Sequence, residues 1–199
     1  MSTITVVRKN GYAAIAADTQ ATRSWQKETA KYVVNHQKVI SVSGSYIAFS
    51  GAASGELILP HYFSRLDSLP DLSNVDAIFA AWLPLHEHLK QTYFVIPNER
   101  DGESFESSRL DVLIANEHGI FSVESHRDVQ ELSRFYAEGS GADYALGAMY
   151  ALYEDDSKSA EDIARIGVEA AAEFNIATGL PIISHSVKLL AESALRVLE

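Results

Sequence analysis

The chain has 199 residues, 47% of them hydrophobic, so it can bury one sizeable apolar core and suits a single domain over residues 1–199. It contains no cysteine, which excludes disulfides, thiolate metal ligands and a cysteine nucleophile. A net charge of -11 argues against nucleic acid or an anionic membrane as a partner, because both attract clustered lysine and arginine.

The first apolar stretch carries two basic residues. Arg8 and Lys9 lie within it, and no long apolar segment follows them. A secretory signal and a membrane-spanning helix both need an uninterrupted apolar segment. The sequence therefore predicts neither, and we expect the protein in the cytoplasm.

Two β-hairpins are predicted in the first quarter of the chain. Residues 3–9 (TITVVRK) and 12–18 (YAAIAAD) flank Asn10-Gly11, a dipeptide typical of a two-residue hairpin turn. Residues 38–42 (KVISV) and 46–51 (YIAFSG) flank a second tight turn, SGS. The chain therefore begins with paired antiparallel strands.

Two helices should follow these hairpins. Apolar residues recur at helical spacing over 52–66 and 74–94. Pro60 should kink or break the first helix, and Pro84 lies inside the second. Aperiodic segments rich in proline, serine and acidic residues are predicted as loops at 68–74 and 98–108.

The second half repeats the order of strands followed by helices. Its third hairpin turns at Glu117-His118-Gly119. The predicted elements are strands at 110–116, 120–125, 134–140 and 181–187 and helices at about 142–153 and 159–174. Residues 188–199 fit a continued strand and a short helix equally.

The helix at 159–174 has the clearest sequence signals. Ser159 and Asp162 form a predicted capping pair at its start. Its buried face is predicted to carry Ile163, Ile166, Ala170 and Phe174. Each helix pair must bury its apolar stripe on a sheet, so the element order predicts an α+β fold: a four-layer αββα sandwich of two stacked antiparallel sheets.

Several segments then resemble a known family. The segment YAAIAADTQAT at 12–22, with the preceding Ser2-Thr3-Ile4 and Asn10-Gly11, is similar to the start of proteasome β-type subunits and of the HslV peptidase. The resemblance continues in matching order through Lys38-Val39, FSGAAS at 49–54 and GSGADYA at 139–145. It implies the N-terminal-nucleophile hydrolase fold, and the chain looks most like the small bacterial proteasome homologues.

In this family the first residue of the mature chain is the nucleophile. The resemblance assigns that role to Ser2 after removal of Met1, with the α-amine of Ser2 as the base. An α-amine has an ordinary pKa near ~8, which suits a base at neutral pH. Thr3 is a minor alternative, because it would need two residues removed.

The resemblance also implies a charged pair beside that amine. Lys38 would lower the pKa of the amine, and Asp18 would hold the lysine ammonium in place. The segment between them is longer than is usual in the family. Lys27 or Lys31 therefore stays open as the partner of Asp18.

Further roles follow by position. Gly51 would supply the oxyanion N–H, and Ser140 would help to relay the proton. Thr178 and Gly179 would support the site, as would Asn175, which stands where the family often has aspartate. Serine in place of the usual threonine nucleophile is a second departure.

The substrate-binding residues implied by the resemblance form one group. They are Thr22, His36, Phe49 and Ala53. The backbone of Thr22 would align an extended peptide as an added strand. The other three would line the pocket for the residue before the cleaved bond, where Phe49 suggests an apolar preference.

No cofactor and no metal is predicted. His86 and His88 lie two residues apart on a predicted helix and match no zinc pattern. The resemblance implies an endopeptidase that cleaves polypeptides inside a homo-oligomer of stacked rings, each of six or seven subunits, with an ATP-dependent unfoldase as a candidate partner. Two alternatives remain: an inactive ring scaffold, which Asn175 and the spacing before Lys38 favour, and an amidase acting on a small-molecule amide.

Overall fold

The structure is a computed structural model that describes residues 2–23, 26–96 and 104–191. Its helices and strands alternate in groups along the chain. In chain order they are β1 (Thr3–Lys9), β2 (Tyr12–Asp18), β3 (Ala21–Arg23), β4 (Gln26–Glu28), β5 (Val39–Val42), β6 (Ser45–Gly51), α1 (Gly55–Phe63), α2 (Val75–Gln91), β7 (Leu110–Asn116), β8 (Gly119–Val123), β9 (Val129–Leu132), β10 (Phe135–Gly139), α3 (Ala142–Leu152), α4 (Ala160–Phe174) and β11 (Ile182–Lys188).

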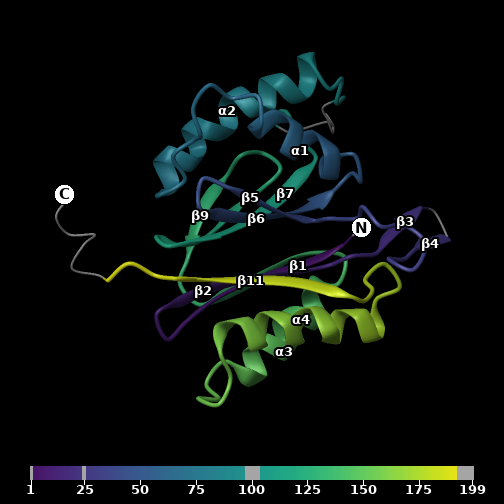
Figure 1. The fold of residues 1–199 in the computed structure, drawn as a ribbon, viewed down its shortest axis with the longest axis vertical. Helices are drawn as coiled ribbons and strands as arrows, with labels where there is room; N and C mark the ends of the chain where they lie inside the picture. The colour runs from purple at the N-terminus through teal and green to yellow at the C-terminus, as the bar shows by residue number, and fades with distance from the viewer. Residues whose placement is uncertain (1, 24–25, 97–103, 192–199) are drawn as a thin grey trace.

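Four layers make up the fold (Figure 1). One antiparallel sheet has the order β10-β1-β2-β11 and the other has the order β5-β6-β7-β8-β9, while β3 and β4 form a separate ribbon. The sheets lie face to face, with α1 and α2 outside the five-stranded sheet and α3 and α4 outside the four-stranded one. The predicted αββα sandwich is confirmed.

The central strands are buried on both faces. Ile4 and Ile15 pack with Leu113 and Ile120 between the two sheets, and all four are fully buried. The opposite face of β1 and β2 packs on α4. This is why both strands carry almost continuous small or β-branched apolar residues instead of an alternating pattern.

The first two hairpins agree with the sequence prediction. Asn10 and Gly11 have φ values of 50° and 75°, and Ser43 and Gly44 have 51° and 75°. Two-residue turns between right-twisted strands need positive φ at both central positions, which Asn-Gly and Ser-Gly tolerate. The first turn fixes the register of β1 on β2, and the second fixes that of β5 on β6.

Both internal prolines lie inside helices, so Pro60 does not break α1. The helix continues to Phe63 because Leu59, Tyr62 and Phe63 are buried against the five-stranded sheet and α2. Packing of an apolar face supplies most of the stability of a helix and here offsets the hydrogen bond that proline removes.

The predicted buried face of α4 is wrong in part. Phe174 is 67% exposed, and Ile166 and Ala170 are only partly buried. The residues that face the core are Ala160, Ile163, Ala164, Gly167, Val168 and Ala171. Small residues bring α4 close to the sheet: a Cβ on Gly167 would lie 3.3 Å from the Thr5 methyl group.

The remaining predictions have mixed outcomes. The capping box at Ser159 and Asp162 is present. The short strands β3, β4 and β9 were not predicted, because three or four residues carry too little periodicity. Of the loop predicted at 98–108, residues 98–103 lie outside the described residues, and 104–108 contain no helix or strand. Residues 192–199 also lie outside, and β11 ends at Lys188.

None of the helices in the described part of the chain combines the length and apolarity needed to cross a membrane.

Candidate active site

A buried carboxylate at the end of β2 organises the site. Oδ1 of Asp18 accepts hydrogen bonds from the Thr3 N–H at 3.0 Å and from Nζ of Lys38 at 2.7 Å. Its Oδ2 accepts from the N–H groups of Gln20 and Gly179, both at 3.1 Å. Four donors therefore satisfy a side chain with no exposed surface, as a buried charge requires.

Lys38 is the partner of Asp18. The side chain of Lys38 is 3% exposed, and Nζ also donates to the carbonyl of Gln20. Burial lowers the pKa of Lys38, and the Asp18 carboxylate opposes that shift. Lys27 and Lys31 are both exposed. The longer segment before Lys38 thus leaves the buried pair intact.

Ser2 lies directly before β1 and is buried. Its carbonyl accepts hydrogen bonds from the N–H of Ser140 at 2.8 Å and from Oγ of Ser140 at 3.4 Å. Gly139 has φ of 98°, and a Cβ there would lie 2.1 Å from the Ser2 carbonyl oxygen. Only glycine allows this approach of β10 to the start of the chain.

Gly51 ends β6 next to Ser2. Its φ is 143°, and a Cβ would come within 2.4 Å of the Arg109 carbonyl oxygen, so the position requires glycine. Gly51, Ser2 and Lys38 line the same cavity. The structure thus brings together a backbone group, a hydroxyl residue and a buried cation.

Asn175 connects two other predicted residues. Its Nδ2 donates to the Ser140 carbonyl at 2.7 Å, and its Oδ1 accepts from the Ala177 N–H at 2.9 Å and from Oγ of Ser140 at 3.2 Å. Next to it, Oγ1 of Thr178 lies 2.6 Å from Oγ1 of Thr3. An ionised carboxylate could not donate to the carbonyl, so the amide suits this position.

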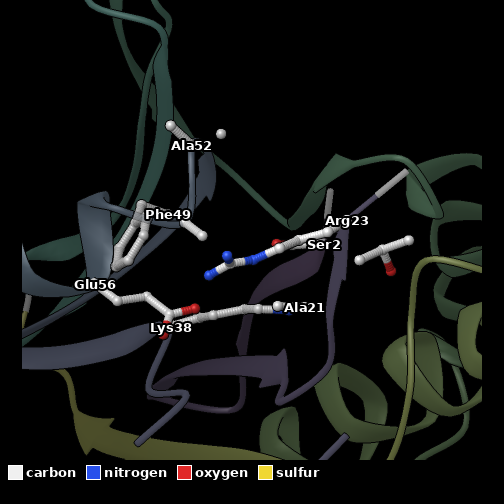
Figure 2. A pocket seen from close by; sticks show the side chains of 10 residues that line it. Ser2, Ala21, Arg23, Lys38, Phe49, Ala52 and Glu56 are labelled. Atoms are coloured by element: carbon white, nitrogen blue, oxygen red, sulfur yellow. The ribbon is translucent and has the colours of Figure 1, made fainter. Parts of the chain in front are cut away.

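The cavity has a volume of about 280 Å³ (Figure 2). The described residues that line it are Ser2, Ala21, Thr22, Arg23, Lys38, Phe49, Gly51, Ala52, Ala53 and Glu56. Three of the four residues expected to bind substrate are among them. The exception is His36, whose Nδ1 lies 2.9 Å from Oε2 of Glu56, a residue of the cavity lining.

Glu56 and Arg23 were not predicted at the site. Glu56 lies in the first turn of α1, where acidic residues are common because they favour the positive end of the helix dipole. It therefore gave no separate signal. Arg23 lies on β3, a strand that the sequence pattern did not indicate.

Together, the αββα layers and the buried lysine–carboxylate pair beside the first strand define the class of N-terminal-nucleophile hydrolases. Solved structures agree. Thiobacillus denitrificans BPH matches with a TM-score of 0.91 and 51% identity, covering 96% of this chain and 100% of that one. Thiobacillus denitrificans BPH in complex with epoxomicin matches with a TM-score of 0.90 and 51% identity, covering 95% and 100%.

A more distant structure shares the fold alone. Eukaryotic HslV from Trypanosoma brucei has a TM-score of 0.63 and 16% identity, covering 94% of this chain and 99% of that one. No model of a known protein family matches the sequence. At 51% identity over the full length of BPH, this chain belongs to the same proteasome-like family as BPH.

Proposed function

We propose that this protein is an endopeptidase that uses Ser2 as its N-terminal nucleophile. The observation that carries the proposal is the buried ion pair of Lys38 with Asp18 in the wall of a cavity that Ser2 also lines. A buried charge pair is costly to maintain and gives little net stability, so its position at a cavity favours a chemical role.

The proposed reaction starts when removal of Met1 frees the α-amine of Ser2. The amine takes the proton of the Ser2 hydroxyl, and the oxygen attacks a peptide carbonyl. The Gly51 N–H donates to the oxyanion. The intermediate collapses to an ester while the leaving amine takes the proton, and water then hydrolyses the ester and restores the hydroxyl.

The other site residues support these steps. The positive charge of Lys38 keeps the amine unprotonated by lowering its pKa, and Asp18 fixes the lysine. We assign the proton relay to Ser140, a role supported by the hydrogen bonds of its hydroxyl to the Ser2 carbonyl and to Asn175. We assign Thr178 and Gly179 to the support of this arrangement.

An extended substrate has a place to bind. Thr22 lies on β3, which pairs with β4 along one edge, and the described residues pair no strand with its other edge. We propose that the peptide adds to this free edge through backbone hydrogen bonds. Its side chain before the cleaved bond would enter the cavity beside Phe49 and Ala53.

The family also supports an assembly. Its members suggest a ring-forming oligomer, and we propose a homo-oligomer of six or seven single-domain subunits in stacked rings. An ATP-dependent unfoldase would deliver folded substrates to it. Negative-stain images of the purified particle count the subunits directly.

The test of the chemistry uses intact-mass measurement of the full chain before and after incubation with a peptidic epoxyketone. We expect loss of Met1 and a single adduct, which peptide mapping places on Ser2. Ser2→Ala should form no adduct, whereas Thr3→Ala should still form one. A chain that retains Met1, forms no adduct and cleaves no peptide contradicts the proposal and indicates a scaffold; cleavage of small amides alone indicates an amidase.

A further inference from the structure

We infer that Glu56 makes the cavity beside Ser2 selective for a lysine or arginine side chain immediately before the cleaved bond. The inference rests on the proposed peptidase function and names its substrate class. Phe49 taken alone predicts an apolar preference, but the structure adds the carboxylate of Glu56 to the same cavity lining.

The carboxylate of Glu56 is held on the wall of the cavity. Its side chain is 7% exposed, and Oε2 lies 2.9 Å from Nδ1 of His36, whose own side chain is 8% exposed. Figure 2 shows Glu56 and Lys38 on one side of the cavity, with Phe49 above them. A buried side chain held in this way points its charge at a fixed position.

Among the described residues, Glu56 is paired with the imidazole of His36 and with no lysine or arginine. Lys38 is paired with Asp18 at 2.7 Å, and Arg23 is paired with Glu28 at 3.2 Å. A carboxylate removed from water without a cation is costly, and a bound substrate cation would offset that cost.

The apolar wall suits the stem of a basic side chain. Phe49, Ala21, Ala52 and Ala53 line the cavity together with Ser2 and Glu56. Lysine and arginine carry several methylene groups that pack on apolar surface while the charged end reaches a carboxylate. A leucine would fill the same space but leave the carboxylate without a partner, and a glutamate would be repelled.

The positive charge of Arg23 opposes the binding of a basic side chain, and it lies on another part of the cavity lining. Its side chain is 72% exposed, so its charge is screened by water. Figure 2 shows it extending from the far side toward Phe49 and Glu56, so the cavity already faces a guanidinium of the protein itself. Because water screens the exposed Arg23, its charge acts on the substrate more weakly than the charge of the buried Glu56 carboxylate. A basic substrate side chain is therefore preferred.

The experiment compares four fluorogenic peptides that differ only in the residue before the cleaved bond: arginine, lysine, leucine or glutamate. With the mature full-length protein we expect kcat/KM for arginine and lysine about tenfold above leucine, the ratio that corresponds to one well-placed charge pair, and about a hundredfold above glutamate. Glu56→Gln should bring the ratio of arginine to leucine to about one.

Glu117→Gln is the matched control, because it removes the same charge from an exposed turn and should leave the ratio unchanged. Epoxyketone labelling of Ser2 shows that each variant is folded and active. Labelling together with a preference of the wild-type protein for leucine or glutamate overturns this inference alone. So does a ratio that Glu56→Gln does not change. Absence of labelling and of all cleavage overturns the peptidase proposal and this inference with it.

Discussion

Two regions of this molecule are equally buried and chemically opposite. Between the sheets, Ile4 and Ile15 are fully buried among apolar neighbours. At one end of the same strands, Asp18 and Lys38 are 0% and 3% exposed. Burial stabilises the first region in proportion to its apolar area but imposes a desolvation cost on the second. A fold keeps the second kind of region where chemistry needs it.

The two regions lie on the same two strands, β1 and β2. β1 carries Ile4 in the apolar layer and Thr3 next to it in the polar cluster, and β2 likewise ends in Ala17 followed by Asp18. A rigid, fully packed sheet thus fixes the geometry of the polar cluster to which it is joined. We therefore expect mutations in the polar cluster to lower activity, with a cost in stability where a buried charge loses its partner, and mutations in the apolar layer to lower mainly stability.

The largest effect is expected for Lys38→Met, which keeps the length of the side chain and removes its charge. Under the proposed mechanism, loss of the cation would raise the pKa of the Ser2 α-amine, and the change also leaves the Asp18 carboxylate without its lysine partner. We expect kcat/KM for peptide cleavage to fall by about 10² to 10⁴, the range for a group that assists proton transfer.

Lys31→Met is the control for this variant, because Lys31 is exposed and should tolerate the change within a factor of about two. Initial rates with a fluorogenic peptide measure both. An equal loss of kcat/KM in the two variants, or no loss in Lys38→Met, would contradict the proposed difference between the two regions.

Ile120→Ala tests the apolar layer. Ile120 is fully buried between the sheets, and truncation leaves a cavity that the packed neighbours cannot fill. We expect the free energy of unfolding to drop by about 3 kcal/mol, within the usual range for such changes. Urea denaturation followed by tryptophan fluorescence measures it.

Below the denaturation transition, the rate of epoxyketone labelling at Ser2 should stay within about twofold of the wild-type rate for Ile120→Ala, since distant sites act independently. Normal stability combined with slow labelling would show that the apolar layer acts on the chemistry directly.

The smallest effect is expected at a third kind of position, the half-buried Glu138 on β10. Burial, and then the charges of Glu124 and Asp111, raise the pKa of Glu138 to about 7 from an ordinary 4.5. The folded state therefore keeps a proton that the unfolded state releases, so stability falls as pH rises from about 4.5 to about 7 and stays low above it.

Glu138→Gln should remove the fall in stability with rising pH. Because solvent screens a half-buried group, we expect a gain of about 1 kcal/mol in the free energy of unfolding above the pKa and no gain near pH ~4. Denaturation midpoints at both ends of the pH range measure this gain. If the free energy of unfolding depends on pH identically in the variant and the wild type, Glu138 does not cause the pH dependence.

Local signals in the sequence sufficed for much of the fold. The hairpin turn at Asn10-Gly11 and the capping box at Ser159 follow from interactions between residues close in the chain. The segment from Tyr12 to Asp18 predicted a strand and was also part of the family resemblance. These features depend on short-range geometry and need no knowledge of distant neighbours.

The wall of the cavity could not be predicted in the same way. Glu56 is an ordinary first-turn residue until the segment before β5 brings His36 to it and β6 brings Phe49 to the same cavity. Likewise, the sequence left three lysines open as partners of Asp18, and only the packing shows Lys38 buried and the others exposed. Such pairings join residues far apart in the chain.

By itself, the sequence determined the order of the longer strands and the helices, the two tight turns and the αββα class, because hydrophobic periodicity and turn chemistry depend on neighbouring residues. Only the tertiary structure decided which face of α4 is buried, which lysine meets Asp18 and which carboxylate enters the cavity. The physical reason is that burial and charge pairing depend on the whole set of packed neighbours, which no local stretch of the chain contains.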